Sequence, residues 1–230
     1  MAGETTKSEA ICLAIHPWSQ TSHVVRWLTP EGQRTTVVRG AVRPKSAFLG
    51  QYDLNYTCEI VYYTQAKGGI HALRECEPLV LREELRSSYC FLQVAGYFRA
   101  MVQFLAPEGE DARDWYELLK NFLDEISAPE TAQRTPEALM ESFLDFDLKL
   151  LKTAGLMPNI AKEESRLVLR GERGIELSSE VASCLRAPRR GWNAKILLDA
   201  LRVIGVFYKF HVEVPSELRR VALEFLINRK

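Results

Sequence analysis

Short stretches of alternating apolar and polar residues fill the first 80 positions of the chain. This alternation is typical of strands that bury one face. Turns are expected between them, at Pro30 to Gly32 and in the run "QAKGG" at residues 65–69. A closed barrel is favoured, because an open sheet of this size would expose its edges. The pattern predicts five strands, at residues 9–15, 22–28, 34–40, 52–63 and 70–75.

After Glu83 the apolar residues recur every three to four positions, which is the spacing of helices that bury one face. The first such run predicts a buried helix of about six turns. Five residues of this run are expected to lie near one face: Leu85, Tyr89, Leu92, Gly96 and Met101.

Further helices are expected at residues 113–126 and 136–155, from about Asn193 and, after Pro215, from Ser216. Pro136 suits a helix start and Gly155 a helix end. Residues 165–178 interrupt the helical spacing and predict a small hairpin turned by Gly171 and Gly174. The pattern therefore predicts an α+β chain, with a barrel domain at residues 1–80 and a helical domain at residues 81–230 that carries the hairpin as an insert.

The composition is that of an ordinary globular protein of 230 residues, 47% hydrophobic and 26% charged, with a formal net charge of zero. No apolar run reaches the roughly 18 residues that a membrane span needs. The N-terminus lacks the basic and apolar regions of a secretory signal. We therefore expect a cytoplasmic protein that is not associated with a membrane.

Neither a metal ion nor a cofactor is expected. The five cysteines form no CxxC pair and the four histidines are scattered, so neither type supplies the closely spaced ligands of a zinc site. Most of the cysteines lie in apolar surroundings, where a free thiol behaves as a small core residue. Reduced, structural thiols are the expectation.

The zero net charge conceals a strong segregation along the chain. Residues 108–147 hold 12 acids and 3 bases, whereas residues 148–230 hold 16 bases and 9 acids. An acidic middle repels polyanions, so an anionic partner is expected to bind the parts before or after it.

The segment between the third and fourth predicted strands is a candidate anion site. Residues 32–52 contain no acid and four bases, namely Arg34, Arg39, Arg43 and Lys45. Uncompensated, closely spaced bases bind nucleic acid by releasing counterions from its phosphates, and Pro44 would limit the entropy lost on binding. Phe48 is expected to anchor the loop. The alternative is a solvated loop whose charges keep the barrel soluble.

The same segment carries a family resemblance. A basic strand end precedes Gly-Ala, an Arg-Pro-Lys core, a phenylalanine and a glycine, here Arg39, Gly40, Ala41, Arg43, Pro44, Lys45, Phe48 and Gly50. With a barrel ahead of a helical domain, and "LLKTAGLMP" closing a long helix, the chain resembles the bacterial recombination mediator family RecO. The resemblance implies a five-stranded OB-fold barrel that binds DNA through Arg34, Arg39, Arg43, Lys45 and Phe48.

The resemblance also implies a role in DNA repair, at the nucleoid within the cytoplasm. Such a protein binds single- and double-stranded DNA and anneals complementary strands. With its partner RecR it loads RecA onto DNA coated by single-stranded DNA-binding protein, whose acidic, apolar-ended C-terminal tail is held by the helical domain. Many relatives carry a zinc module of two CxxC pairs after the third long helix. This chain has only Cys184 there, so its module is degenerate and no zinc is expected.

A second basic cluster lies around the start of the helix expected at Asn193. Its members are Arg186, Arg189, Arg190, Trp192 and Lys195. Cations and an exposed tryptophan at a helix start suit an acidic partner tail or a phosphate. The alternative is a loop between helices in which the tryptophan belongs to the core.

Enzyme motifs of hydrolases, zinc proteases and P-loop proteins are absent from the sequence, so no enzyme is expected. Glu141 and Asp145 share a helix face with Asp147 nearby, which leaves a metal-dependent nuclease as one alternative. A solvated acidic face is favoured because no histidine accompanies them. A generic OB-fold RNA-binding factor is the other alternative. Annealing of protein-coated single strands would identify the mediator, and metal-dependent cleavage the nuclease.

Overall fold

The computed structural model describes residues 4–64, 69–108, 111–163, 166–170, 174–212 and 216–228. The chain forms two compact units. The barrel unit comprises Met1–Glu83 and Val102–Asp124, and the helical unit comprises Glu84–Met101 and Glu125–Lys230. That residues 1–80 form a domain of their own stays a prediction.

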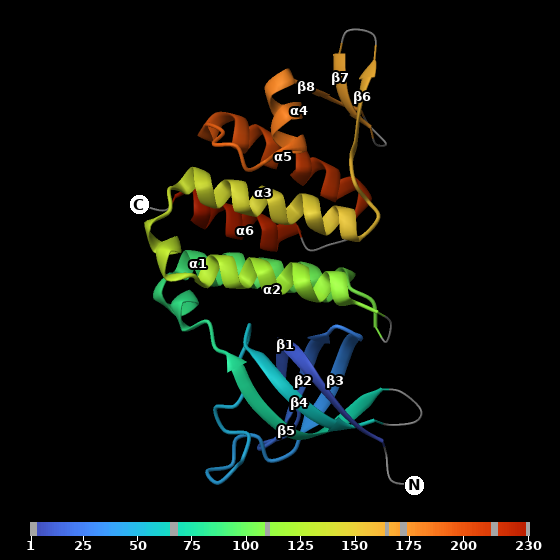
Figure 1. Ribbon diagram of the computed structural model, residues 1–230, viewed down its shortest axis with the longest axis vertical. Coiled ribbons are helices and arrows are strands. Elements are labelled where there is room, and N and C mark those ends of the chain that lie inside the picture. Colours follow the sequence, from blue (N-terminus) through green and yellow to red (C-terminus); the bar gives the residue numbers. More distant parts are fainter. Residues whose placement is uncertain are drawn as a thin grey trace. The chain divides into compact units, whose positions relative to one another are not determined.

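Five strands close into the barrel that the alternating pattern predicts (Figure 1). They are Thr5–Pro17 (β1), His23–Thr29 (β2), Gly32–Val38 (β3), Thr57–Tyr63 (β4) and Ile70–Val80 (β5). The strands pair in the order β1-β2-β3-β5-β4, and β4 pairs again with β1. β3 and β5 pair in parallel, while the other pairs are antiparallel. The expected OB-fold barrel followed by a helical region is confirmed.

β1 bends so that it can serve two neighbours. Thr5–Ile11 pairs with β4, Ile11–Pro17 pairs with β2, and the register shifts between Cys12 and Ala14. An extra residue at such a point bends a strand and increases its twist. This irregularity lets one 13-residue strand contribute to both sides of the closure.

The fourth strand is shorter than predicted, because β4 begins at Thr57 rather than at Tyr52. A turn precedes it, in which the Tyr56 N–H donates to the Asp53 carbonyl at 3.1 Å. Asn55 has a φ of 68°, a conformation that asparagine tolerates better than most residues. The turn at Asp53 and Asn55 thus interrupts the segment for which the apolar pattern predicts one long strand.

Alternation divides the aromatic residues of the barrel between its inside and its outside. Trp27, Tyr56 and Tyr62 are buried in the core, whereas Trp18 and Tyr63 are exposed. The Trp27 Nε1–H donates to the Thr36 hydroxyl at 2.9 Å, which satisfies the indole inside the barrel. Successive residues of a strand point to opposite faces, so only some of these aromatic rings enter the core.

Most of the remaining described chain is helical (Figure 1). Two short 3-10 helices are Glu83–Ser87 (η1) and Pro129–Gln133 (η2). The α-helices are Tyr89–Leu105 (α1), Arg113–Ser127 (α2), Pro136–Thr153 (α3), Ser179–Arg186 (α4), Ala194–His211 (α5) and Ser216–Ile227 (α6). Among the helices of the described residues, none has the length and apolar character that a membrane crossing requires.

Helix ends follow their sequence signals. Thr135 caps α3 by accepting the Ala138 N–H at 3.2 Å, and Gly155 follows the helix with a φ of 71°. α4 was not predicted from the sequence, although Ser178 caps it by accepting the Val181 N–H at 3.2 Å. Three predicted features lie outside the described residues, in whole or in part: residues 65–68 of the turn before β5, Gly171 and Pro215.

The first predicted helix is wrong in its length and in part of its buried face. η1 occupies its start, and α1 begins only at Tyr89. Leu85 and Met101 are buried as predicted, but Tyr89 is 60% exposed and Leu92 is 38% exposed. Besides Met101, the buried face of α1 includes positions that the prediction did not name: Phe91, Val94, Ala95, Phe98 and Val102. The break after Ser87 changes the helical phase, because Leu85 belongs to η1 and α1 starts anew.

A small antiparallel sheet lies between α3 and α4 in the sequence (Figure 1). Its strands are Asn159–Glu163 (β6), Arg166–Arg170 (β7) and Ile175–Leu177 (β8). β7 and β8 pair as the predicted hairpin within residues 165–178, and β6 adds a strand that the sequence analysis did not predict.

The core of the helical unit combines stacked rings with one buried ion pair. The rings of Tyr97 and Phe143 stack at 4.8 Å between their centroids. The fully buried Asp147 accepts from the Tyr97 hydroxyl at 2.5 Å and from Arg219 Nη2 at 2.7 Å. Gly205 leaves room for this arginine, since a Cβ there would lie 2.8 Å from Arg219 Nη1. Arg219 therefore joins α6 to α3 through a buried ion pair.

Replacing Arg219 by alanine should lower the free energy of unfolding by about 3–5 kcal/mol, because the Asp147 carboxylate would stay buried without its partner. Arg220→Ala is the matched control from the next position of α6. Arg220 forms exposed ion pairs with Glu217 and Glu224, each at 2.6 Å, so its loss should change the stability little. Urea unfolding of the two variants measures the difference, and equal losses would contradict a stabilising role for the buried pair.

Candidate nucleic-acid interface

The loop between β3 and β4 is a succession of tight turns. Its backbone N–H groups donate to carbonyls three residues earlier: Arg43 to Gly40 at 3.1 Å, Ser46 to Arg43 at 2.9 Å, Leu49 to Ser46 at 3.3 Å and Gln51 to Phe48 at 3.1 Å. Such bonds are typical of β-turns, so the loop has a defined path rather than an open one.

Two hydrogen bonds hold this loop against the connection between β1 and β2. The Val42 N–H donates to the Thr21 carbonyl at 3.3 Å, and the Gly40 N–H donates to the Ser22 hydroxyl at 3.2 Å. Gly40 has a φ of 67°, and a Cβ at this position would also lie 3.2 Å from Cδ of Arg43. Glycine is therefore needed for both the turn and the placement of the arginine.

The five predicted DNA-binding residues differ in their surroundings. Arg39, Arg43 and Lys45 are exposed, and none of them forms an ion pair with any residue of the described ranges. Arg34 is half-buried and donates to the carbonyls of Gln33 and Glu31, each at 2.9 Å. Phe48 packs against the barrel core, which agrees with its expected role as an anchor of the loop but leaves little of its ring for a ligand.

An open hollow of about 890 Å³ lies beside the loop. Arg39 and Arg43 line it together with Trp18, and Ser19, Thr21 and Ser22 are also among its lining residues. None of the described residues that line this hollow is acidic. The fold thus brings two of the predicted DNA-binding arginines together with an aromatic residue from the β1–β2 connection.

A second hollow, of about 880 Å³, adjoins the first, because Val24 and Ile70 line both. Arg26 and Arg34 contribute its positive charges, with Glu108 as an acid at its wall. Arg26 was not among the residues predicted from the sequence. The alternation of β2 offered a signal, since the neighbouring Val25 and Trp27 are buried and Arg26 must then point outward.

His71 lines the second hollow, and its ring stacks on Tyr62 with 5.2 Å between the centroids. Burial lowers the pKa of His71 from its ordinary value of 6.5, and the nearby positive charge of Arg34 lowers it further. Both effects favour the neutral imidazole at neutral pH. The positive charge of this hollow therefore comes from its arginines.

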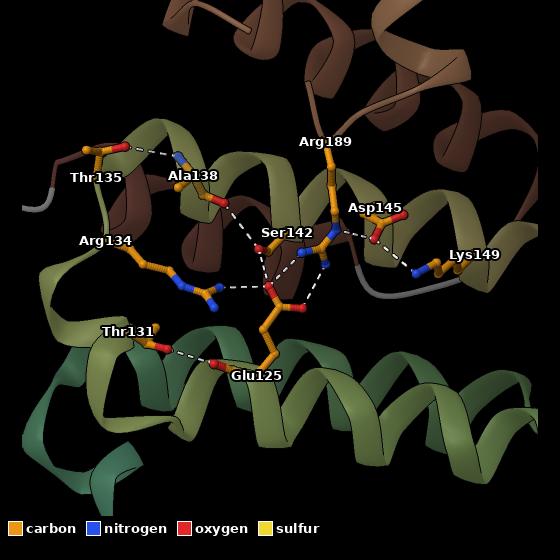
Figure 2. Close-up of polar contacts among 9 residues, drawn as sticks. All are labelled: Glu125, Thr131, Arg134, Thr135, Ala138, Ser142, Asp145, Lys149 and Arg189. Carbon is orange, nitrogen blue, oxygen red and sulfur yellow. Dashed lines mark hydrogen bonds and ion pairs between the residues drawn. The ribbon is translucent and has the colours of Figure 1, made fainter. Parts of the chain in front are cut away.

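Part of the second basic cluster is already paired with carboxylates of the protein itself, as Figure 2 shows for Arg189. Its two terminal nitrogens donate to the two carboxylate oxygens of Glu125 at 2.8 and 2.7 Å, and its Nε donates to Asp145 at 2.5 Å. Lys149 also pairs with Asp145 at 3.1 Å. Arg189 is thus a structural residue that joins the loop before α5 to α3 and to the end of α2.

The other members of this cluster also differ from one another. Trp192 is half-buried, and its Nε1–H donates to the Ala187 carbonyl at 2.9 Å. Its backbone N–H donates to Glu141 at 2.9 Å. Arg186, Arg190 and Lys195 are exposed, without an ion pair to the part of the chain that the structure describes. These three side chains are the cations of the cluster that an anionic partner can reach.

Two models of one protein family match the chain. Residues 1–82 match the model described as "Recombination protein O N terminal", and residues 92–220 match "Recombination protein O C terminal". The chain belongs to the RecO family. The two matches together span the barrel and most of the helical region, so the resemblance read from residues 39–50 is confirmed.

A curated relative is DNA repair protein RecO of Syntrophus aciditrophicus (strain SB). It is 23% identical over 155 residues, which cover 67% of this chain and 57% of the relative. The matched region thus spans a little more than half the length of that RecO protein.

The segment for which the resemblance predicts a degenerate zinc module forms the β6–β8 sheet and α4. Burial and, to a lesser extent, the charge of the Glu141 carboxylate together raise the pKa of the Cys184 thiol to about 11, which disfavours the thiolate that metals bind. Within the described ranges, His, Cys, Asp and Glu nowhere gather in threes to hold a metal. The absence of bound zinc stays a prediction.

The expected solvated acidic face on α3 is wrong. Asp145 and Asp147 are buried and pair with Arg189 and Arg219, while Glu141 accepts a backbone N–H. Sequence spacing placed these carboxylates near one another, but the arginines that neutralise them come from about 40 to 70 residues later in the chain. The arrangement is that of a structural network.

Glu125 makes this network sensitive to acid. Burial by itself would raise the pKa of Glu125, but hydrogen bonds from Arg189, Ser142 and Arg134 outweigh burial and hold the pKa at about 2, against an ordinary 4.5. A depressed carboxyl pKa stabilises the fold above about pH 4.5, and the stabilisation disappears as the pH falls toward 2. We expect about 3 kcal/mol to be lost over this window.

Urea unfolding between pH 6 and pH 2.5 measures this loss. In Glu125→Gln the part of the pH dependence that belongs to this carboxyl should disappear. Glu130→Gln, which changes an exposed glutamate a few residues away, should keep the wild-type dependence. The same pH profile in all three proteins would contradict the assignment to Glu125.

Proposed function

We propose that this protein is a recombination mediator in DNA repair and that it binds DNA through the barrel. One observation carries the proposal: two adjoining hollows gather Arg26, Arg34, Arg39 and Arg43 on one surface of the barrel. Membership of the RecO family and the name of the relative as a DNA repair protein support the biological role.

The binding mechanism is the neutralisation of phosphates. Arg39, Arg43 and Lys45 are exposed and form no ion pair with the described residues, so their charges are not already satisfied within the protein. A polyanion that meets such side chains releases its condensed counterions, which favours association. Because hydrogen bonds from Gly40 and Val42 already hold the loop, little ordering entropy is lost on binding.

The resemblance to RecO proteins supports the later steps that we propose. The protein anneals complementary strands and, together with RecR, helps load RecA onto DNA coated by single-stranded DNA-binding protein. Annealing needs a surface that neutralises two polyanions without breaking a bond, and the basic hollows suit such positioning. We accordingly propose that the protein performs no covalent chemistry.

A small pocket in the helical unit favours a second interaction, with the acidic, apolar-ended tail of single-stranded DNA-binding protein. Its volume is about 150 Å³, and its lining is apolar except for Arg186: Leu148, Met157, Pro158, Ile160, Leu185 and Ile204. An apolar peptide end fits such a lining, and the exposed guanidinium suits a terminal or acidic carboxylate. Arg190 and Lys195 add positive charge to the helical unit without lining the pocket.

A generic RNA-binding factor is the alternative function. Arginine and lysine side chains on an OB-fold barrel that form no ion pair within the described residues also suit the phosphates of RNA. Competition between DNA and RNA oligonucleotides of equal length separates the two functions. Preference for RNA, together with no annealing of coated complementary strands, would favour the alternative.

Replacing Arg39, Arg43 and Lys45 together by alanine should weaken DNA binding at low salt and flatten its salt dependence. Each lost phosphate contact should lower the slope of log Kobs against log salt by about 0.7 to 0.9. The measurement is a series of anisotropy titrations between low and moderate salt.

Lys7→Ala combined with Arg74→Ala is the matched control on the same barrel. These bases are already paired, with Glu59 at 2.7 Å and Glu75 at 3.2 Å, so their loss should leave the slope nearly unchanged. An unchanged slope in a folded triple variant would remove the loop from the DNA site.

Arg186→Ala in the full chain should weaken the binding of an acidic peptide with an apolar C-terminus, because it removes the cation at the pocket. We expect roughly a tenfold higher Kd, as for the loss of one charge-assisted hydrogen bond. Arg190→Ala removes an equally exposed cation that does not line the pocket, and should have a smaller effect. Equal effects of the two changes would indicate attraction to the cluster as a whole.

A further inference from the structure

Trp18 is the largest side chain of the first hollow, and charge neutralisation does not explain it. It is 65% exposed, whereas Trp27 and Trp115 are buried. Tryptophan is highly buried on average in soluble proteins, so such exposure at the wall of a hollow indicates a ligand-binding site.

The backbone of Trp18 has a fixed position. Its N–H donates to the Ser22 carbonyl at 2.8 Å, which closes the connection between β1 and β2. Ser22 in turn accepts the Gly40 N–H, so the connection and the basic loop are held together. The indole, Arg39 and Arg43 therefore line one hollow from two segments that hydrogen bonds keep in place.

We propose that Trp18 stacks on an unpaired base of single-stranded DNA while Arg39 and Arg43 bind the adjoining phosphates. The inference rests on the proposed DNA-binding function and adds to it a preference for single over double strands. Stacking on an aromatic side chain tolerates every base, because each base has a π-face. A protein that must act on any sequence can use this contact without reading the sequence.

Duplex DNA cannot use the indole in the same way. Its bases already stack on one another, so their faces are available only at the ends or after unstacking. The arginines, by contrast, meet phosphates in both forms of DNA. The tryptophan should therefore contribute to the binding of single strands and hardly to that of duplexes.

The surroundings of the ring favour a nucleotide over a protein surface. The hollow has the volume of a small-ligand site, and its described lining offers cations and hydroxyl groups but no acid. Hydroxyls such as those of Ser19 and Thr21 bind phosphate and sugar oxygens in protein–DNA complexes. A protein docking on Trp18 is the competing explanation, and the experiment separates it from stacking.

The test compares the wild-type chain with Trp18→Ala and Trp18→Phe, using an oligo-dT and a duplex of equal length. Trp18→Ala should raise the Kd for the single strand about tenfold. The Kd for the duplex should change less than about twofold, since only the phosphate contacts matter there. Trp18→Phe keeps an aromatic face and should recover most of the loss.

Tryptophan fluorescence offers an independent readout. Binding of oligo-dT should quench part of the emission of the wild-type protein, and Trp18→Phe should remove that quenching while it still binds. Equal losses on single and double strands, or no loss on either, would overturn the stacking role of Trp18. These outcomes differ from a failure of the proposed function, in which the wild-type protein binds neither form of DNA.

Discussion

The parallel pairing of β3 with β5 is the constraint on which the candidate interface depends. Because β5 and β2 flank β3, the chain cannot pass from β3 into β4 by a short hairpin. It must cross to the gap between β1 and β5, and this crossing needs the long connection that carries Arg39, Arg43 and Lys45. Closure of the barrel therefore creates both the basic loop and its contact with the β1–β2 connection.

The helical unit shows what burial does to charge. Asp147 and Arg219 meet in a buried site, where an unpaired charge would be very costly, so each depends on the other. Glu125 and Asp145 bind Arg189 at a more open place (Figure 2). Charges that are segregated along the sequence thus neutralise each other in the fold. The cations available to a partner are the ones that these networks do not use.

This distinction between used and unused charges connects the fold with the proposed function. Arg39, Arg43 and Lys45 in the barrel unit, and Arg186 in the helical unit, are exposed and form no ion pair with the described residues. Each of these groups lies next to apolar or aromatic surface, Trp18 in the first case and the pocket around Leu185 in the second. Such pairs of features suit ligands that are anionic and partly apolar, as nucleotides and acidic peptide ends are.

Local chemistry determined much of this protein from the sequence alone. Alternation along residues 9–75 determined a barrel, because each strand must bury one face. The Arg-Pro-Lys segment indicated the protein family, because a motif of consecutive residues can be recognised without knowing any tertiary contact. Pro136 and Gly155 marked the ends of α3, because such signals act within one helical turn.

Only the tertiary structure decided which charged and aromatic side chains are free. In the sequence Arg189 could not be distinguished from the other basic residues of its cluster. Its partners Glu125 and Asp145 lie 64 and 44 residues away in the sequence. The buried face of α1 depended on where η1 ends, which the apolar spacing could not indicate. Trp18 gained its place beside Arg39 and Arg43 only when the barrel closed. Contacts between distant segments form through burial and pairing in three dimensions, and a pattern read along one dimension does not contain them.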